Sequence, residues 1–152
     1  MKIYNIKEKL EFLEEVARLT QKEWGNKSYT KGQQEEKIKQ KMQKIINNID
    51  NTNYCKLVLI DNNVLVGFIS IFPIDGEERQ DLTPWYATLY VKKEFRKKGY
   101  SKILNDAILK EAKLRGFKKI YLKTDLNNFY EKYGFTYLET LKNGEKLYFK
   151  EL

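Results

Sequence analysis

A polar stretch with the sequence RKKGYS, residues 96–101, places three cationic side chains beside a glycine and a serine. The cationic side chains raise the local positive potential. Gly99 lacks a Cβ, so the backbone can approach a bulky anion and adopt unusual dihedral angles there. The stretch lies between a predicted strand and a predicted helix, and the first turn of a helix presents unpaired backbone N–H groups. The pattern therefore predicts an anion site, with Ser101 as a helix cap or as a donor to a phosphate.

The spacing of this stretch separates it from two common phosphate-binding loops. It contains neither the G-x-x-x-x-G-K-[ST] pattern of the Walker loop nor the G-x-G-x-x-G pattern of dinucleotide-binding proteins. Taken alone, the pattern R-x-x-G-x-S is also typical of an ordinary basic helix start. The surrounding sequence therefore has to decide between the two interpretations.

The chain contains no histidine and one cysteine, Cys55. These counts exclude a Ser-His-Asp triad, a Cys-His pair and the usual zinc sites, so we expect no metal. Cys55 stands at the edge of an apolar run, which indicates a partly buried side chain without a catalytic role. Any chemistry must use the remaining polar side chains, backbone groups and water. That restriction suits a substrate that arrives already activated.

The composition predicts one soluble globular domain over residues 1–152, since 41% of the residues are hydrophobic and 33% are charged. No stretch approaches the roughly 20 apolar residues of a membrane span, and acidic residues interrupt the N-terminal apolar pattern. We therefore expect a cytoplasmic protein without a membrane partner. The net charge of +8 attracts anions in general. Because this charge is spread along the chain and no nucleic-acid-binding motif is present, we expect no nucleic-acid partner.

The elements that must position the RKKGYS stretch follow from hydrophobic periodicity and turn residues. An Asn-Gly pair at 143–144 predicts a closing hairpin, and Gly116 predicts the end of a helix. Helices are expected over about 7–23, 33–48, 100–115 and 127–132, and strands over 55–60, 64–72, 85–91, 119–123, 135–141 and 146–149. This order predicts a mixed α/β domain.

The region from Trp85 to Tyr137 resembles the GNAT superfamily of N-acetyltransferases. The family pattern is a strand ending in valine, then R/Q-x-x-G-x-G/A/S, an amphipathic helix, a further strand, and a tyrosine-containing helix before Gly-Phe. The matching residues are Val91, Arg96, Gly99, Ser101, Tyr130, Gly134 and Phe135. The resemblance implies a mixed, mostly antiparallel sheet with helices on both faces. It also implies a splayed strand pair that receives the cofactor.

The resemblance further implies acetyl-CoA as the acyl donor. The backbone N–H groups of residues 96–101 would then hold the pyrophosphate, and the strand edge at 89–91 would pair with the pantetheine arm. A backbone N–H near Leu89 or Tyr90 would polarise the thioester carbonyl. The residues expected to bind the cofactor are Leu89, Tyr90, Val91, Arg96, Lys97, Lys98, Gly99, Tyr100, Ser101 and Asn127. Asn128 is the alternative to Asn127, and either residue could instead cap the short helix.

Tyr130 is the expected general acid, because it matches the tyrosine of the family's Y-x-x-x-G-F pattern and a phenol can protonate a departing thiolate. Tyr133 is the nearby alternative, and simple packing of Tyr130 on its aromatic neighbours is the other. No base can be assigned, because the strand WYATLYV carries no carboxylate. The alternatives are an acid of the preceding loop (Glu77, Glu78 or Asp81) and a water held by Thr88 or a tyrosine.

Four aromatic residues are expected near the acceptor: Trp24, Tyr29, Trp85 and Tyr86. An aromatic pocket could receive an amine by cation–π contact, although each of these side chains could also pack in the core. The leading hypothesis is acetylation of a primary amine on a small molecule, and a peptide or protein amine is the second acceptor class. A non-catalytic CoA-binding module is a further alternative. The resemblance is also consistent with a homodimer.

Overall fold

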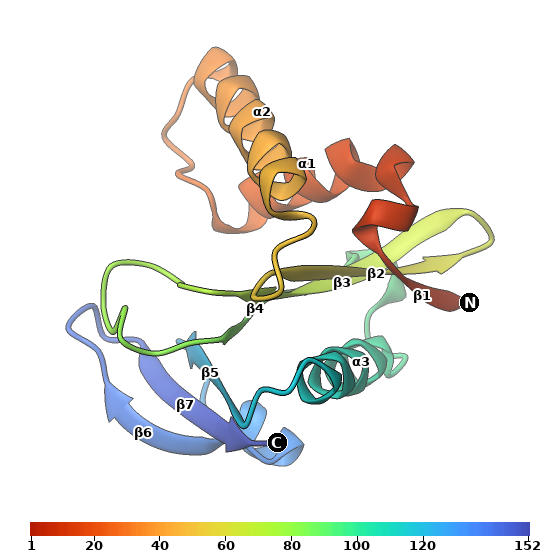
Figure 1. Ribbon diagram of the computed structural model, residues 1–152. Coiled ribbons are helices and arrows are strands. Elements are labelled where there is room, and N and C mark those ends of the chain that lie inside the picture. Colours follow the sequence, from red (N-terminus) through yellow and green to blue (C-terminus); the bar gives the residue numbers. More distant parts are fainter.

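The computed structural model describes residues 1–152 and is built around one seven-stranded sheet (Figure 1). In chain order the strands are β1 (Lys2–Asn5), β2 (Cys55–Asp61), β3 (Val64–Phe72), β4 (Trp85–Val91), β5 (Lys119–Thr124), β6 (Thr136–Thr140) and β7 (Lys146–Glu151). They are arranged β1-β2-β3-β4-β5-β7-β6, and each neighbouring pair is antiparallel except β4 and β5.

Helices cover both faces of this sheet (Figure 1). The three α-helices are α1 (Leu13–Trp24), α2 (Lys31–Asn48) and α3 (Tyr100–Leu114). One hydrophobic cluster joins Val16 of α1 and Ile45 of α2 to Val58 of β2, while another joins Leu104 of α3 to Leu57 of β2. Successive residues of β2 therefore face opposite cores, as alternation in a strand requires. The expected fold class is confirmed.

The strands β4 and β5 diverge almost as soon as they meet. They pair in parallel only at Trp85 and Tyr121, where the N–H of Tyr121 donates to the Pro84 carbonyl at 3.1 Å. Beyond this point the edge of β4 that faces β5 has no strand partner. Backbone polar groups on such an edge must find other partners, so the gap can receive an extended ligand. This is the splayed pair that the family resemblance predicts.

The N-terminal region differs from the expectation of one helix over 7–23. The chain begins with β1, which pairs antiparallel with β2 at the edge of the sheet. Two 3₁₀ turns follow, Ile6–Glu8 and Leu10–Phe12, and only then does α1 begin. A strand as short as β1 has a weak local signal, and pairing with β2 decides its conformation.

The short helix expected over 127–132 is also corrected. A single 3₁₀ turn, Tyr130–Tyr133, stands there and ends at Gly134 with φ of 87°. Asn128 adopts a left-handed φ of 57°, which prevents a helix from starting before it. Asn127 therefore caps no helix.

Helix α2 begins with a capping box that we expect to contribute measurably to stability. The Thr30 hydroxyl accepts from the Gln33 N–H at 3.2 Å, and the Thr30 N–H donates to Gln33 Oε1 at 2.8 Å. Thr30→Ala should lower the free energy of unfolding by about 1 kcal/mol in urea titrations. Thr30→Ser keeps the hydroxyl and should stay close to wild type. Equal losses in both variants would contradict the role of the cap.

No helix has both the length and the apolar character needed to cross a membrane. Cys55 is more deeply buried than expected, with 2% of its surface exposed. Burial raises the pKa of its thiol to about 11, so the thiol stays protonated and is a poor nucleophile.

Candidate active site

The turn before α3 forms a cradle of backbone N–H groups. Gly99 has φ of 82° and directly precedes the helix, while Lys97 has φ of 64°. The N–H groups of residues 97–99 donate to no acceptor within the protein, and no side chain caps the helix. Together with the first turn of α3 they present several free donors at the positive end of the helix dipole. This arrangement fits a phosphate or pyrophosphate group.

Arg96 and Ser101 fix this turn from either side. The Arg96 side chain donates from Nε to the Val91 carbonyl at 2.8 Å, and its guanidinium lies 5.5 Å from the Tyr90 ring centroid. The Ser101 hydroxyl is 3.4 Å from the hydroxyl of Tyr133 and does not cap the helix. The remaining N–H groups of Arg96 stay available for an anion.

A cleft of about 570 Å³ extends from this turn along β4 to the 3₁₀ turn at Tyr130–Tyr133. We call it the donor cleft. Of the ten residues expected to bind the cofactor, eight line it: Leu89, Tyr90, Val91, Arg96, Lys97, Gly99, Tyr100 and Ser101. The side chains of Lys98 and Asn127 are exposed and do not line it. Lys98 therefore contributes only its backbone N–H to the turn, and the position of Asn127 does not support a role in binding the cofactor.

A second cleft of about 640 Å³, which we call the acceptor cleft, lies along residues 86–89 of β4, whereas the donor cleft lies along residues 89–91. Residues of α1, α2 and the four strands β2, β3, β4 and β5 line it, together with the segment after β3 and the turn before β7. Four residues line both clefts: Glu23, Leu89, Leu126 and Tyr130. A group held in the donor cleft can therefore meet a molecule in the acceptor cleft at Leu89 and Tyr130.

A β-bulge shapes β4 where the clefts meet. Phe68 pairs with Tyr90 and Ser70 pairs with Ala87, so one residue of β3 faces two residues of β4. Thr88, within the bulge, has φ of 51°, and its hydroxyl is 2.6 Å from the hydroxyl of Ser70. Bulges redirect backbone groups and are common beside active sites. This one opens the strand next to Leu89.

Tyr130 is held in place by aromatic contacts. Its ring packs edge-on against Phe129, Tyr86 and Phe135, with centroids 4.8, 5.7 and 6.0 Å away. No fully buried side-chain nitrogen or oxygen lacks a hydrogen-bond partner, and the Tyr130 hydroxyl makes no hydrogen bond, so this hydroxyl reaches the cleft surface. Burial raises the pKa of Tyr130 to about 12, which keeps the phenol protonated.

The four aromatic residues expected near the acceptor have different positions. Trp24 and Tyr86 line the acceptor cleft. Trp24 is 50% exposed, and the hydroxyl of the buried Tyr86 donates to Asn105 Oδ1 at 2.9 Å. Tyr29 lines neither cleft, and its ring lies 5.8 Å from the amino group of Lys37.

Trp85 corrects the expectation of an acceptor-pocket residue. It is fully buried, it packs with Leu141 and Leu147, and its indole N–H donates to the Leu82 carbonyl at 2.8 Å. Its position at the start of β4, where β5 joins the sheet, places the indole in the core between β4 and β7. Trp85 therefore packs in the core, which was the stated alternative to a place in the acceptor pocket.

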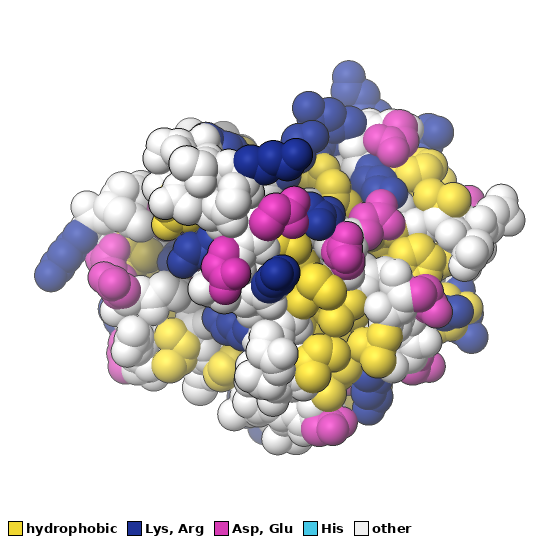
Figure 2. Space-filling view, turned by 90° about the horizontal axis from the view of Figure 1, so that it is seen from above, with side chains coloured by type: hydrophobic (Ala, Val, Ile, Leu, Met, Phe, Trp, Pro, Cys, Tyr) yellow, Lys and Arg dark blue, Asp and Glu magenta, His cyan; other side chains and the backbone are white.

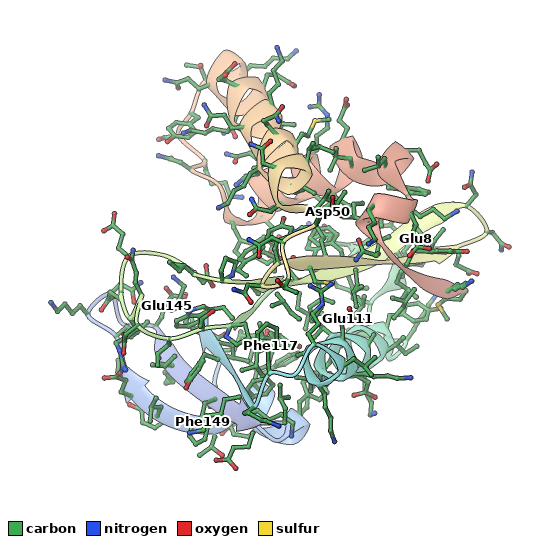
Figure 3. The ribbon with its side chains drawn as sticks, in the orientation of Figure 1. Glu8, Asp50, Glu111, Phe117, Glu145 and Phe149 are labelled. Atoms are coloured by element: carbon green, nitrogen blue, oxygen red, sulfur yellow. The ribbon has the colours of Figure 1, made fainter.

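None of the loop acids weighed as a base lines either cleft. Glu78 instead accepts from the Lys142 N–H at 2.8 Å, and Asp81 pairs with Arg79. The acceptor cleft contains four other carboxylates and four lysines, which sequence reasoning missed: Glu23, Asp75, Asp125, Glu145, Lys41, Lys44, Lys56 and Lys123. They come from several elements far apart in the sequence, so no single local motif indicates them. Glu145 lies just before β7, beside the loop that follows β3 (Figure 3).

The surface over α1 and α2 carries both signs of charge. In Figure 2 lysine and arginine side chains are interspersed with aspartate and glutamate around hydrophobic areas. Ion pairs such as Arg18 with Glu35, at 2.8 Å, contribute to this mixing. On this face the net charge of +8 is therefore not gathered into one continuous basic patch of the kind that binds nucleic acids.

Comparisons with known proteins concern the family and the fold of this chain. The sequence model described as "Acetyltransferase (GNAT) family" matches residues 13–135. The fold is similar to an aminoglycoside 6'-N-acetyltransferase complexed with coenzyme A, with 21% identity, a TM-score of 0.73, and coverage of 99% of this chain and 97% of the other. No functionally curated protein matches the sequence.

Two further solved structures are similar over nearly their whole length. The PaiA N-acetyltransferase from Thermoplasma acidophilum, in complex with coenzyme A, has 26% identity and a TM-score of 0.70, with both chains covered completely. The aminoglycoside 6'-N-acetyltransferase from Enterococcus faecium has 20% identity and a TM-score of 0.71, with coverage of 99% of this chain and 97% of the other.

Proposed function

This chain belongs to the GNAT acetyltransferase family, and we propose that it transfers an acetyl group from acetyl-CoA to a primary amine of a small molecule. The observation that carries the proposal is the junction of the two clefts at Leu89 and Tyr130, beside the splayed strands. Coenzyme A complexes of two similar acetyltransferases support the donor, and the names of the aminoglycoside enzymes support a small amine as acceptor.

The residues of the donor cleft fit a coenzyme A thioester. The free N–H groups of residues 97–99 and the first turn of α3 would hold the pyrophosphate, with Arg96 beside them. The unpaired edge of β4 would accept and donate hydrogen bonds to the pantetheine amides. Lys132, which also lines the cleft, adds positive charge, whereas Lys102 is paired with Asp106 at 2.6 Å. Acetyl-CoA would supply an acetyl group already activated as a thioester.

Three tasks then fall to residues of this chain. A backbone N–H at the bulge, near Leu89 or Tyr90, would stabilise negative charge on the carbonyl oxygen. The Tyr130 hydroxyl would donate its proton toward the departing sulfur. The acceptor amine must lose a proton, and Glu23 is the carboxylate that lines both clefts. The walls of the acceptor cleft would hold the amine in line with the thioester.

Calorimetric titration of acetyl-CoA and CoA, followed by assay of CoA release with a panel of amines, tests this function. We expect micromolar binding of both ligands and CoA release that depends on an added amine. Because the site is cationic and its ligand carries phosphates, raising the salt concentration should weaken binding. Binding without amine-dependent CoA release would favour a non-catalytic CoA-binding module. Absence of binding would refute the proposed donor.

A further inference from the structure

Lys56 occupies an unusual position for a lysine. It lies on β2, two residues before Val58, so its side chain enters the core face covered by α1 and α2. Only 3% of its surface is exposed. Its amino group lies 5.4 and 5.5 Å from the ring centroids of Phe68 and Phe72 on the neighbouring strand. The amino group is therefore above β3, on the side of the sheet that forms the acceptor cleft.

The Lys56 amino group has no counter-charge. No carboxylate lies within 4.0 Å of it, nor of Lys41 and Lys44, which reach the same cleft from α2. No fully buried side-chain nitrogen or oxygen lacks a hydrogen-bond partner, and this amino group makes no hydrogen bond, so it reaches the surface of the cleft that Lys56 lines. A largely desolvated ammonium without a partner destabilises the fold. An anion in the cleft would remove that destabilisation.

The surroundings of Lys56 add to this preference for an anion. Burial and the neighbouring charges of Lys41 and Lys44 lower the pKa of Lys56 to about 7. The hydroxyl of Tyr54 is a further donor, because Tyr54 lines the cleft, makes no side-chain hydrogen bond and stacks on Phe72 with centroids 5.5 Å apart. Lys41, Lys44, Lys56 and Tyr54 thus line one cleft, and none of the three amino groups forms an ion pair within 4.0 Å in the protein.

We propose that Lys41, Lys44 and Lys56, which we call the lysine pocket, bind an anionic group of the acceptor, so that the substrate is an amine that also carries a carboxylate or phosphate. The inference rests on the proposed function and narrows its substrate class. The Lys56 backbone pairs with Ser70, whose hydroxyl contacts Thr88 in the bulge of β4. Neighbouring strands are about 4.8 Å apart, so a short chain can span from the lysine pocket to the thioester.

The opposite charges in the cleft are placed to receive the amine. Glu23 lines both clefts and stands at their junction, where the amine must lie. Asp75 faces Lys123 at 4.0 Å, so it already has a counter-charge. The lysine pocket would repel a polycation and would stay without a counter-charge. A zwitterion instead offers an anion to the lysine pocket and an amine to Glu23. We therefore expect acceptors of the ω-amino acid type rather than polyamines.

The first test measures the binding of pentanoate to the free protein by NMR titration. It requires neither acetyl-CoA nor turnover. Lys56→Met should weaken pentanoate at least about tenfold, as expected for loss of a charged hydrogen bond, and Lys41→Met should weaken it by a smaller factor. Lys39→Met is the control, because Lys39 is exposed on the same helix and lines neither cleft. Equal pentanoate affinity in wild type and Lys56→Met would overturn the inference.

The pH dependence of the same titration adds an independent readout. The charged groups nearest Lys56 are Lys41 and Lys44 from α2, and β3 contributes only Phe68, Phe72 and Ser70. Raising the pH from 6 to 9 removes the proton from Lys56, while the carboxylate stays ionised. Pentanoate should therefore bind more weakly at pH 9 in wild type. A titration in which affinity is independent of pH would contradict Lys56 as the anion-binding group.

Turnover then tests the substrate class with three amines of equal length: 5-aminopentanoate, pentylamine and 1,5-diaminopentane. Wild type should prefer 5-aminopentanoate in kcat/KM by at least about tenfold, and Lys56→Met should remove most of that preference. Equal rates for all three would overturn the inference. The inference would also be overturned if mass spectrometry showed that Lys56 itself is acetylated while the preference in kcat/KM stayed unchanged. Failure of the proposed function would give a different result from failure of this inference. In that case acetyl-CoA would not bind, while pentanoate would still bind more weakly to Lys56→Met than to wild type.

Discussion

Tyr130→Phe is expected to lower kcat by about 10²-fold, within the range for loss of a general acid, while the affinity for acetyl-CoA stays close to wild type. The substitution removes only the hydroxyl, which faces the point where the two clefts meet. The phenyl ring keeps its edge-on contacts with Tyr86 and Phe135. The loss should therefore appear in kcat and kcat/KM together, as for an interaction made only in the transition state.

The raised pKa of Tyr130 defines what its hydroxyl can do. At about 12 the pKa lies well above neutral pH, so the phenol keeps its proton and donates a hydrogen bond to the sulfur as negative charge develops there. Because the deprotonated form is absent below about pH 10, activity should show no falling limb from Tyr130 between pH 7 and 10. Steady-state kinetics across this range would check both the fold-change and the profile.

Two other tyrosines distinguish this role from a general effect of losing a hydroxyl. Tyr137 is exposed on β6, where its hydroxyl contacts Thr140 away from both clefts, so Tyr137→Phe should match wild type. Tyr133 lines only the donor cleft, and its hydroxyl contacts Ser101. Tyr133→Phe should raise the KM for acetyl-CoA more than it lowers kcat. If Tyr133→Phe rather than Tyr130→Phe lost kcat, the proton donor would be Tyr133.

The donor side of this site could be predicted from sequence because its determinants are local. The strand 85–91 was predicted at the bounds that the structure gives to β4, since a run rich in aromatic and β-branched residues precedes a basic, glycine-containing turn. The conformation of Gly99 follows from a local need for positive φ. Lys98 is the exception within the turn, because its exposed side chain does not line the cleft.

The acceptor side could not be predicted, because its residues meet only in the folded protein. Lys56 stands in an apolar run, and a lysine in such a run indicates an exposed position on the solvent face of a half-buried strand. Both faces of β2 are covered by helices, so the same alternation buries it. The prediction that Trp85 lies near the acceptor was wrong for a related reason. Its place in the sequence suggested the cleft, but β5 meets β4 there and encloses the indole.

In the proposed acceptor site, Lys56 breaks a local rule of protein cores. A lysine buried at 3% exposure without a carboxylate destabilises the fold, and a protein retains such a residue where it has a task. Lys56, Lys41 and Lys44 therefore carry more information about the substrate than the overall charge of the chain does. The charge of +8 is a sum over the surface, whereas the lysine pocket is a fixed arrangement inside a cleft.

Gly99→Trp is expected to raise the Kd for acetyl-CoA by at least about 100-fold, equivalent to ~2.7 kcal/mol of binding free energy. Gly99 lines the donor cleft immediately before α3, in the turn whose N–H groups would hold the pyrophosphate. A Cβ at this position meets no atom within 4 Å, so the indole would project into free space on the cleft wall. It would exclude the phosphates sterically and disturb a turn whose φ of 82° suits glycine.

Gly116→Trp is the matched control for the backbone strain in that variant. Gly116 has φ of 87°, its Cβ would also meet no atom within 4 Å, and it follows the opposite end of the same helix, outside both clefts. Both variants should lose about 1–2 kcal/mol of stability from the left-handed conformation. Only Gly99→Trp should lose acetyl-CoA in calorimetry. If both variants bound acetyl-CoA like wild type, the pyrophosphate would have to lie elsewhere and the turn at 96–101 would be an ordinary basic helix start.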